Sequence, residues 1–380
     1  MDVVIDRDIL LAAVSRAALV TDATSLLHAL GNVQLAASGR TLRVSATDLY
    51  MSSDESVEAE VIEPGAVALP ANELLNILAR VPRGPVQLKG DNAVHVHQVG
   101  RSLDYCLLGS SGDDSLRMPE LPTGPWAAMD GESVLDGFRA VVRCASRNEN
   151  RPEFNAVLWT SDGARTLYVA ADHCRLGVAQ RGSATPVTFS ALVPLDAAEA
   201  LVIGRTRGEA RTLPPWMSRG LVDVAVHSDG VREHLFLRNE GRLFCAKLVK
   251  MAFPAYAHVI PERFTTSVVV NSRALLDTIR DVTAATAPES VGVLLTVMPG
   301  HIRVAYDSET VKSVSEAPVD YCGAASPSIG LDPKLVTDAL LALDGDVFIG
   351  INGKEDPIVI SSAGHTGADT NKYIIMPMRK

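Results

Sequence analysis

One contiguous group in the sequence combines an acid, an imidazole and a thiol. Asp172, His173 and Cys174 are the residue types of a nucleophile with its base. Asp48 and Asp307 stand at matching places in two other segments, after similar strand-like runs. Three carboxylates in three separate segments favour a turn role, in which the side chain accepts backbone N–H groups. Adjacent strand residues point to opposite faces, so an enzyme centred on His173 and Cys174 is the less favoured alternative.

Other motifs of catalysis or metal binding are missing from the sequence. It contains no GxxxxGK[ST], HExxH or GxSxG, and no GxGxxG after a strand. The five cysteines are scattered, without CxxC pairs, which indicates a reducing compartment and no structural zinc. His95 and His97 alternate with valines and are expected on one solvated strand face. We predict no catalytic residue, no metal and no cofactor, and no nucleotidyl transfer, because no segment shows a pair of metal-binding carboxylates.

Basic residues concentrate on or beside the expected helices, although the 380-residue chain has a net charge of −10. Arg139, Arg143 and Arg147 are four residues apart, which predicts that they share one helix face. A basic stripe on an acidic protein indicates a phosphate-facing surface, and no base-reading motif accompanies it, so binding is expected to be independent of sequence. The candidate residues of this surface are Arg16, Arg80, Arg83, Arg139, Arg143, Arg147, Arg205, Arg273, Arg280 and Lys334.

An internal repeat organises the chain. The run Leu42–Asp48 recurs in character as Leu167–Asp172 and Ile302–Asp307, and the spacing from Asp48 to Asp172 equals that from Pro70 to Pro194. The expected fold is α+β, with three repeated domains over 1–123, 124–253 and 254–380, each with two helices packed on antiparallel sheet. The expected helices run over Arg7–Val20, Asn72–Arg80, Gly131 through Val142, Asp196–Gly204, Ser272–Thr286 and Pro333–Leu343, with Asp6 and Asn271 as N-caps.

The last ten residues, Asn371–Lys380, combine a short strand with an apolar tail. Tyr373–Ile375 has the aromatic and β-branched residues of a strand, which Pro377 must end. Met376 and Met378 flank that proline, and methionine suits adaptable binding surfaces. From the residues alone, two interpretations stay open: a strand in its own core, or one wall of a groove for a partner.

Taken together, these segments resemble the bacterial β sliding clamps, the processivity (beta) subunits of DNA polymerase III. The resemblance runs end to end and is carried by Ala46–Leu49, Arg151–Leu158, Ala170–Leu176, Phe253–Pro261 and Tyr373–Arg379. It implies a non-enzymatic DNA clamp. Two chains would join head to tail in a ring of six DNA-clamp domains around duplex DNA and confer processivity in DNA replication. The dimer contact is expected between Arg101–Leu108 and the first helix and adjacent strand of the third domain.

The resemblance also implies a pocket for partner peptides between the second and third domains. The DNA polymerase III alpha subunit, the clamp loader, other polymerases and repair proteins would insert short apolar-aromatic motifs there. Four positions depart from the family pattern: His173 replaces glycine, Cys174 histidine, Leu335 tyrosine and His258 arginine. The implied lining is Phe154, Ala171, His173, Cys174, Arg175, Leu176, Pro254, His258, Val259, Asp332, Leu335, Pro357, Ile374, Ile375, Met376, Pro377, Met378 and Arg379.

Because four pocket positions depart from the family pattern, a second interpretation stays open: a specialised clamp (of phage or resistance type) that binds different partners. The N-terminus lacks the basic and apolar regions of a signal peptide, and no apolar run reaches membrane-spanning length, so a cytoplasmic, nucleoid-associated protein is expected. The second repeat contains an additional loop, Arg207–Gly220, to which the sequence assigns no role.

Overall fold

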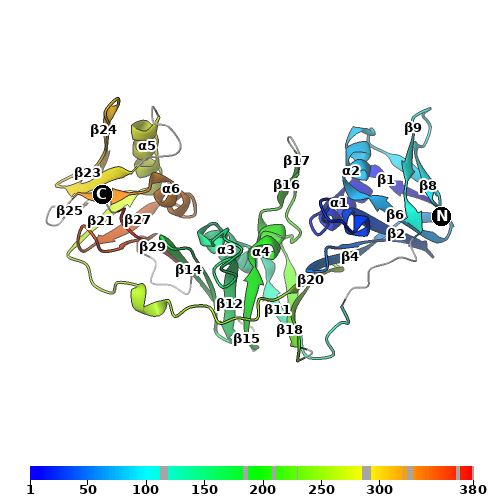
Figure 1. The fold of residues 1–380 in the computed structure, drawn as a ribbon, viewed down its shortest axis with the longest axis horizontal. Coiled ribbons are helices and arrows are strands. Elements are labelled where there is room, and N and C mark those ends of the chain that lie inside the picture. Colours follow the sequence, from blue (N-terminus) through cyan, green and yellow to red (C-terminus); the bar gives the residue numbers. More distant parts are fainter. Residues whose placement is uncertain are drawn as a thin grey trace. The chain divides into compact units, whose positions relative to one another are not determined.

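The computed structural model describes residues 1–111, 119–182, 187–207, 211–228, 230–284, 292–319, 321–322, 328–364 and 369–378. The chain forms two compact units, each built from two separate stretches. Figure 1 shows their helices and strands, coloured along the sequence from blue at the N-terminus to red at the C-terminus. Unit 1 is Met1–Leu135 with Asp196–Lys250, and unit 2 is Asp136–Leu195 with Met251–Lys380. In the described part of the chain, no helix is both long and apolar enough to cross a membrane.

The helices are short, and their starts follow from capping residues. The Asp6 carboxylate accepts hydrogen bonds from the backbone of the first turn of one helix, and the Asn271 side chain does the same for another, as predicted. Asp332 caps a third helix, in which Pro333 occupies the first turn, where its missing N–H costs nothing. The α-helices are α1 (Arg7–Ala18), α2 (Ala71–Arg80), α3 (Gly131–Val141), α4 (Leu195–Val202), α5 (Ser272–Thr283) and α6 (Pro333–Leu341).

The prediction that three arginines share one helix face is wrong. Helix α3 ends before Arg143, which lies in a short 3-10 turn, and the chain beyond that turn is extended. The backbone N–H of Ser146 donates to the carbonyl of Phe154 at 2.9 Å, so it is bonded to the segment that leads into the next strand and not to the preceding helical turn. Arg147 therefore lies outside the helix that carries Arg139.

Unit 1 contains two antiparallel sheets and a hairpin. One sheet has five strands in the order β5-β1-β7-β8-β9, the other has nine in the order β10-β6-β2-β3-β4-β20-β19-β18-β11, and β16 pairs with β17. The strands are β1 (Asp2–Asp6), β2 (Asn32–Ser38), β3 (Thr41–Thr47), β4 (Met51–Glu58), β5 (Glu60–Glu63), β6 (Gly65–Pro70), β7 (Pro85–Gly90), β8 (Ala93–Gln98), β9 (Asp104–Leu108), β10 (Ser110–Ser111), β11 (Ala127–Asp130), β16 (Arg205–Arg207), β17 (Arg211–Leu213), β18 (Leu221–Ser228), β19 (Glu233–Asn239) and β20 (Arg242–Lys247).

Unit 2 contains two antiparallel sheets of the same design. Nine strands follow the order β15-β12-β13-β14-β29-β28-β27-β21-β25, and four follow the order β24-β23-β22-β26. The strands are β12 (Ala156–Asp162), β13 (Arg165–Ala171), β14 (Arg175–Gly182), β15 (Thr188–Pro194), β21 (Thr266–Asn271), β22 (Val293–Met298), β23 (His301–Asp307), β24 (Lys312–Pro318), β25 (Tyr321–Cys322), β26 (Ile329–Leu331), β27 (Asp346–Ile351), β28 (Ile358–Ser362) and β29 (Thr370–Ile375).

The sheets confirm the triple repeat. The strand series β6-β2-β3-β4 has the same order as β15-β12-β13-β14 and β26-β22-β23-β24. A second series, β1-β7-β8-β9, has the same order as β11-β18-β19-β20 and β21-β27-β28-β29. Each repeat thus contributes two four-stranded halves, and the last strand of one repeat pairs with the last strand of the first half of the repeat before it.

The additional loop of the second repeat anchors itself in the core of unit 1. It contains β17, and its Trp216 side chain is fully buried, 5.3 Å from the Phe244 ring between centroids. The indole N–H of Trp216 donates to the Ser53 hydroxyl at 2.9 Å, so its polar atom is satisfied. The loop therefore ties the second repeat to strand β4 of the first.

The C-terminal strand is part of the core, as the first of the two interpretations of the last ten residues predicts. Strand β29 lies between β14 and β28, and Tyr373 is buried. The Tyr373 hydroxyl donates to the Ala140 carbonyl in α3 at 2.8 Å. Beyond the strand, Met376 is 44% exposed and Met378 is 46% exposed, so the groove-wall interpretation stays a prediction for the residues after the strand.

Replacing Tyr373 by phenylalanine is expected to lower the free energy of unfolding of unit 2 by about 1 kcal/mol, because the buried Ala140 carbonyl loses a donor. The matched control is Tyr168→Phe: the Tyr168 hydroxyl is buried without a hydrogen-bond partner among the described residues, so its removal should be neutral or stabilising. Urea unfolding of both variants measures the difference. An equal loss in the two variants would contradict the assignment of the Tyr373 hydrogen bond.

Candidate functional site

The aspartates that end the third strand-like run of the first two repeats organise tight turns, as predicted. Asp48 Oδ1 accepts the backbone N–H groups of Tyr50 and Met51 at 2.9 and 2.6 Å. Asp172 Oδ1 accepts those of the equivalent residues, Cys174 and Arg175, at 2.8 and 2.9 Å. The carboxylates are therefore structural, and His173 and Cys174 lie in a turn and not in a strand.

The third repeat departs from this pattern, and the turn role predicted for its aspartate is wrong. Ser308, the following residue, accepts the turn N–H groups of Thr310 and Val311 through its hydroxyl. Asp307 instead lies 3.2 Å from Lys312 Nζ.

Around the Asp172 turn, unit 2 contains a groove with a cavity of about 230 Å³. The turn supplies one wall, the segment after the second repeat supplies another, and the end of β29 supplies the third. Of the pocket residues inferred from the resemblance, nine line it: Phe154, Ala171, His173, Arg175, Leu176, Pro254, Val259, Ile374 and Met376. The structure thus brings together residues from four distant stretches of the sequence.

The floor of this groove is continuous with the hydrophobic core. Ala171, Leu176 and Ile374 are buried in one cluster, against which Phe253 and Tyr256 pack partly exposed. The rings of Phe253 and Tyr256 meet edge to face at 6.1 Å between centroids. Apolar and aromatic walls around a small cavity suit the insertion of one or two apolar side chains.

Sequence reasoning missed four residues of the lining: Asp172, Phe253, Ala255 and Tyr256. Three of them belong to Phe253–Pro261, the segment between the second and third repeats that also carries part of the family resemblance. Two aromatic side chains in a proline-rich connection were the available signal, because a simple linker has no need of them.

The other inferred pocket residues lie outside the cavity. Cys174, Asp332 and Leu335 line an adjacent, more polar cavity of about 290 Å³ together with Asp172, His173 and Arg175. His258, Pro357, Ile375, Pro377 and Met378 line neither cavity, and Arg379 lies outside the described residues.

Asp172 and Arg175, which line both cavities, belong to a charged network. Arg175 is 11% exposed; its Nε lies 3.1 Å from Asp172 Oδ2, and its Nη1 lies 2.7 Å from Asp338 Oδ2. Arg143 reaches the same Asp338 at 3.6 Å. Because a nearly buried guanidinium is stable only with such partners, the network fixes the Asp172 turn against α6.

The thiols do not support the enzyme alternative. Burial, followed by the carboxylates of Asp172 and Asp332, raises the pKa of Cys174, so its thiolate is disfavoured. Burial raises the pKa of Cys144 to about 12. Across the described residues, no group of three or more His, Cys, Asp or Glu side chains is arranged to hold a metal ion.

The basic residues that the sequence predicts to face phosphate groups differ in whether they are already paired with a carboxylate. Arg16 donates through Nε and Nη2 to Glu55 at 2.8 and 2.7 Å, and Glu55 is buried, so this arginine has a structural partner. Arg80, Arg273 and Lys334 are exposed and have no ion-pair partner in the part of the chain that is described.

The remaining candidates are intermediate cases. Arg83, Arg139, Arg143 and Arg280 each lie within 4 Å of a carboxylate. Arg147 is exposed beyond α3, and the Arg205 side chain lies outside the described residues.

Comparison with known proteins gives matches at both ends of the chain. Residues 1–122 match the family model of the DNA polymerase III beta subunit, N-terminal domain, and residues 257–379 match that of its C-terminal domain. A beta sliding clamp of Synechococcus elongatus is 26% identical over 363 residues, which cover 92% of each protein.

Solved structures show the same fold over the whole length. The DNA polymerase sliding clamp of Bacillus subtilis superposes with a TM-score of 0.86 at 20% identity, covering 100% of this chain and 99% of that one. A sliding clamp of Pseudomonas aeruginosa bound to griselimycin superposes with a TM-score of 0.85 at 21% identity, covering 100% of both chains.

The reactivity of Cys174 tests the electrostatics of the turn. Because its pKa is raised, a smaller fraction is thiolate at pH 8, and alkylation by iodoacetamide is expected to be slower than for a cysteine in an unstructured peptide. Mass spectrometry of the Cys174 peptide against time gives the rate, and Cys144, buried, serves as an unreactive control. A Cys174 rate above that of the free peptide would support an activated nucleophile.

Proposed function

Because the chain belongs to the DNA polymerase III beta subunit family, we propose that it is a sliding clamp that encircles duplex DNA and tethers the replicative polymerase and other proteins to it. Members of this family are processivity factors of DNA replication and not enzymes. The single observation that carries the ring is the pair of sheet edges that the triple repeat leaves open.

Within the chain, the same edge pairing occurs twice. Strand β4 of the first repeat pairs with β20 of the second, and β14 of the second pairs with β29 of the third. Among the described residues, β24 of the third repeat pairs with no strand of a following repeat, and β9 of the first repeat pairs with no strand of a preceding one. In a head-to-tail dimer, β9 of each copy would pair with β24 of the other copy. Both edges are then covered, and the two chains form a closed ring of six domains.

This pairing agrees with the dimer contact expected from the sequence. The segment Arg101–Leu108 contains β9, where Leu108 is 76% exposed. In the third repeat, β24 packs against α5, and its Val314 is 51% exposed. Exposed apolar side chains on unpaired edge strands are a liability in a monomer and useful in a dimer interface.

We propose domain boundaries at 1–123, 124–253 and 254–380. The two compact units do not coincide with these domains, because the second domain contributes four strands to each nine-stranded sheet. Strong pairing across the joints explains why the contacts group the chain by sheet.

DNA binding is proposed to depend on exposed cations near helix ends, led by Arg80, Arg273 and Lys334. They are phosphate contacts without base readout, as sliding requires. Arg16 is set apart from them by its pairing with Glu55. Partners such as the polymerase III alpha subunit, the clamp loader and repair proteins are proposed to insert apolar-aromatic peptides into the groove around the Asp172 turn.

The relatives of Synechococcus elongatus and Streptomyces coelicolor, which match 92% and 100% of the chain, are named beta sliding clamps, and this favours a general replication clamp. The specialised clamp stays the second candidate, because a relative of Streptomyces muensis that matches 92% of the chain is named beta sliding clamp homolog GriR. A protein that acts on the bacterial chromosome works in the cytoplasm, at the nucleoid, and we propose that location for this chain.

The ring predicts topological retention on DNA. Protein assembled on a nicked circular plasmid by a bacterial clamp loader should co-elute with the plasmid in gel filtration at a salt concentration that screens surface contacts. Cutting the plasmid once with a restriction enzyme should release the protein, because it slides off the ends. Equal retention on circular and linear DNA would mean binding by surface contacts and would refute encirclement.

The groove predicts a sharp effect of charge at Met376. Met376→Glu is expected to weaken binding of a labelled peptide with leucine and phenylalanine side chains at least tenfold, about 1.4 kcal/mol, because the new carboxylate loses water as the peptide enters. Met251→Glu changes an exposed methionine that does not line the groove, and it should leave the affinity unchanged. Fluorescence polarisation gives both affinities. Unchanged binding by Met376→Glu would remove the tail from the site.

A further inference from the structure

The joint between the first and second repeats has the same construction as the joint that holds the groove. The Asp48 turn corresponds to the Asp172 turn, and the strand after each turn pairs with the last strand of the next repeat. One hydrogen bond makes the correspondence specific. Lys247 N donates to Tyr50 O at 2.8 Å, and Met376 N donates to Cys174 O at 2.7 Å. Lys247 therefore occupies the position that Met376 occupies in the groove.

This first joint also has a cavity, of about 600 Å³. Its lining comes from the turn, from the end of the first repeat, and from β18 to β20 of the second repeat with the loop between β18 and β19. The residues are Thr47, Leu49, Tyr50, Ser52, Pro119, Glu120, His227, Arg232, His234 and Lys247.

The chemistry of the two equivalent cavities is opposite. Ala171 and Leu176 of the groove correspond to Thr47 and Ser52, which stand at the same places relative to the capping aspartate. The apolar side chains of the groove are thus replaced by hydroxyl groups in the cavity of the first joint, and Met376 is replaced by the positively charged Lys247. The two hydroxyls are bonded to each other at 2.8 Å, so they form a fixed polar floor.

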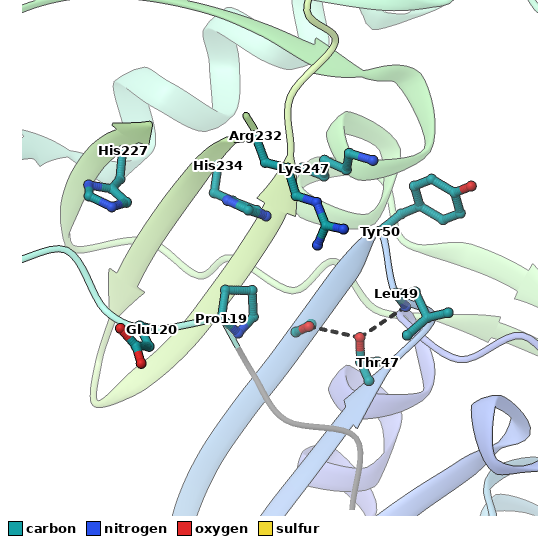
Figure 2. Close-up of a pocket in the computed structure, with 10 residues that line it drawn as sticks. Thr47, Leu49, Tyr50, Pro119, Glu120, His227, Arg232, His234 and Lys247 are labelled. Carbon is teal, nitrogen blue, oxygen red and sulfur yellow. Dashed lines mark hydrogen bonds between the residues drawn. The ribbon is translucent and has the colours of Figure 1, made fainter. Parts of the chain in front are cut away.

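Nitrogen-bearing side chains form a row on one face of the sheet. His227 in β18 is directly opposite His234 in β19, and His234 is directly opposite Lys247 in β20. Residues directly opposite in antiparallel strands project from the same face, with Cβ atoms about 4.5–5.5 Å apart. Figure 2 shows Arg232, next to this row, on the same side of the pocket as His234.

The charges that line this cavity and the side chains at its rim indicate which ligands it can bind. Arg232 and Lys247 carry positive charges, and Glu120 is the one carboxylate among the ten lining residues. Leu49 is 57% exposed and Tyr50 is 67% exposed, so the rim of the cavity is apolar and aromatic (Figure 2). Lys247 Nζ lies 5.5 Å from the centre of the Tyr50 ring.

We propose that this cavity is a second docking site of the chain, and that its occupant is a short acidic peptide segment of a partner protein. Its carboxylates would contact Lys247 and Arg232, and an apolar side chain would rest on Leu49 and Tyr50. Charge complementarity carries the choice of an acidic ligand. The choice of a peptide rests on the proposed function, because the equivalent joint is the proposed peptide groove, and a cavity of this size exceeds a single anion.

The test uses the full-length protein and a fluorescein-labelled hexaglutamate peptide, followed by fluorescence polarisation at low salt. A labelled hexaserine peptide measures background. Lys247→Glu and Arg232→Glu should each weaken hexaglutamate binding about tenfold, and Glu120→Gln should tighten it about twofold, because one repulsive charge is removed. Arg40→Glu makes the same change of charge at a site 88% exposed and outside the cavity, and it should change the affinity less than twofold.

A second variant guards against a folding defect. Lys247→Gln removes the charge and keeps the length of the side chain, so it should weaken binding about threefold while the melting temperature stays that of the native protein. The proposal is overturned if hexaserine binds as tightly as hexaglutamate. It is also overturned if Arg40→Glu weakens hexaglutamate binding as much as Lys247→Glu does. A short DNA duplex that displaces hexaglutamate, and whose own binding Lys247→Glu weakens tenfold, assigns the cavity to DNA phosphates and overturns it too.

The groove is monitored in the same preparations with the apolar-aromatic peptide. Met376→Glu should not change hexaglutamate binding, since the two cavities share no residue. Loss of hexaglutamate binding with intact binding of the apolar peptide refutes the second site alone. If the apolar peptide does not bind but hexaglutamate binds in a way that depends on Lys247, the groove is refuted. The cavity at the first joint then remains a site for an anionic ligand.

Discussion

The structure depends on the pairing of one sheet edge with another at each joint between repeats. Four strands of one repeat end in an open edge, and the last strand of the next repeat covers it, as β20 covers β4 and β29 covers β14. Unpaired backbone groups at an edge invite association, so covering them stabilises the chain and sets the order of the repeats. The same constraint explains the compact units, which follow the nine-stranded sheets, and it leaves β9 and β24 as edge strands among the described residues.

Because each joint places a turn, a connecting segment and a strand end side by side, each joint also forms a cavity. The Asp48 and Asp172 turns have nearly identical hydrogen bonds, so the backbone of the two cavities is alike. Their side chains then determine what each can hold. At the second joint, Leu176 and Ile374 continue the hydrophobic core into the groove, whereas Lys247 and the two histidines of the first joint face an open polar space.

Buried ion pairs divide the basic residues into two groups. Arg16 with Glu55, and Arg175 with Asp172 and Asp338, hold strands and helices together, because a nearly buried guanidinium is stable only when it is paired. Arg80 and Arg273 are exposed near helix ends without an ion-pair partner among the described residues, which is why we propose them for phosphate contacts. The negative total charge of the chain is therefore compatible with a local surface for DNA.

The sequence by itself determined the triple repeat, the N-caps Asp6 and Asn271, the turn role of Asp48 and Asp172, and the strand at Tyr373. The caps, turns and strand depend on residues within one or two helical turns or one hairpin, so their pattern is visible locally, and the repeat is visible because such patterns recur along the chain. Only the tertiary structure decided where α3 ends and which partner Arg16 has, and only it placed Phe253 and Tyr256 in the groove. Each of these depends on groups far apart in the chain: Glu55 lies 39 residues from Arg16, and the groove joins a turn of the second repeat to the end of the third. Their contacts become fixed when edges pair and side chains are buried, and neither event leaves a periodic signal in the sequence.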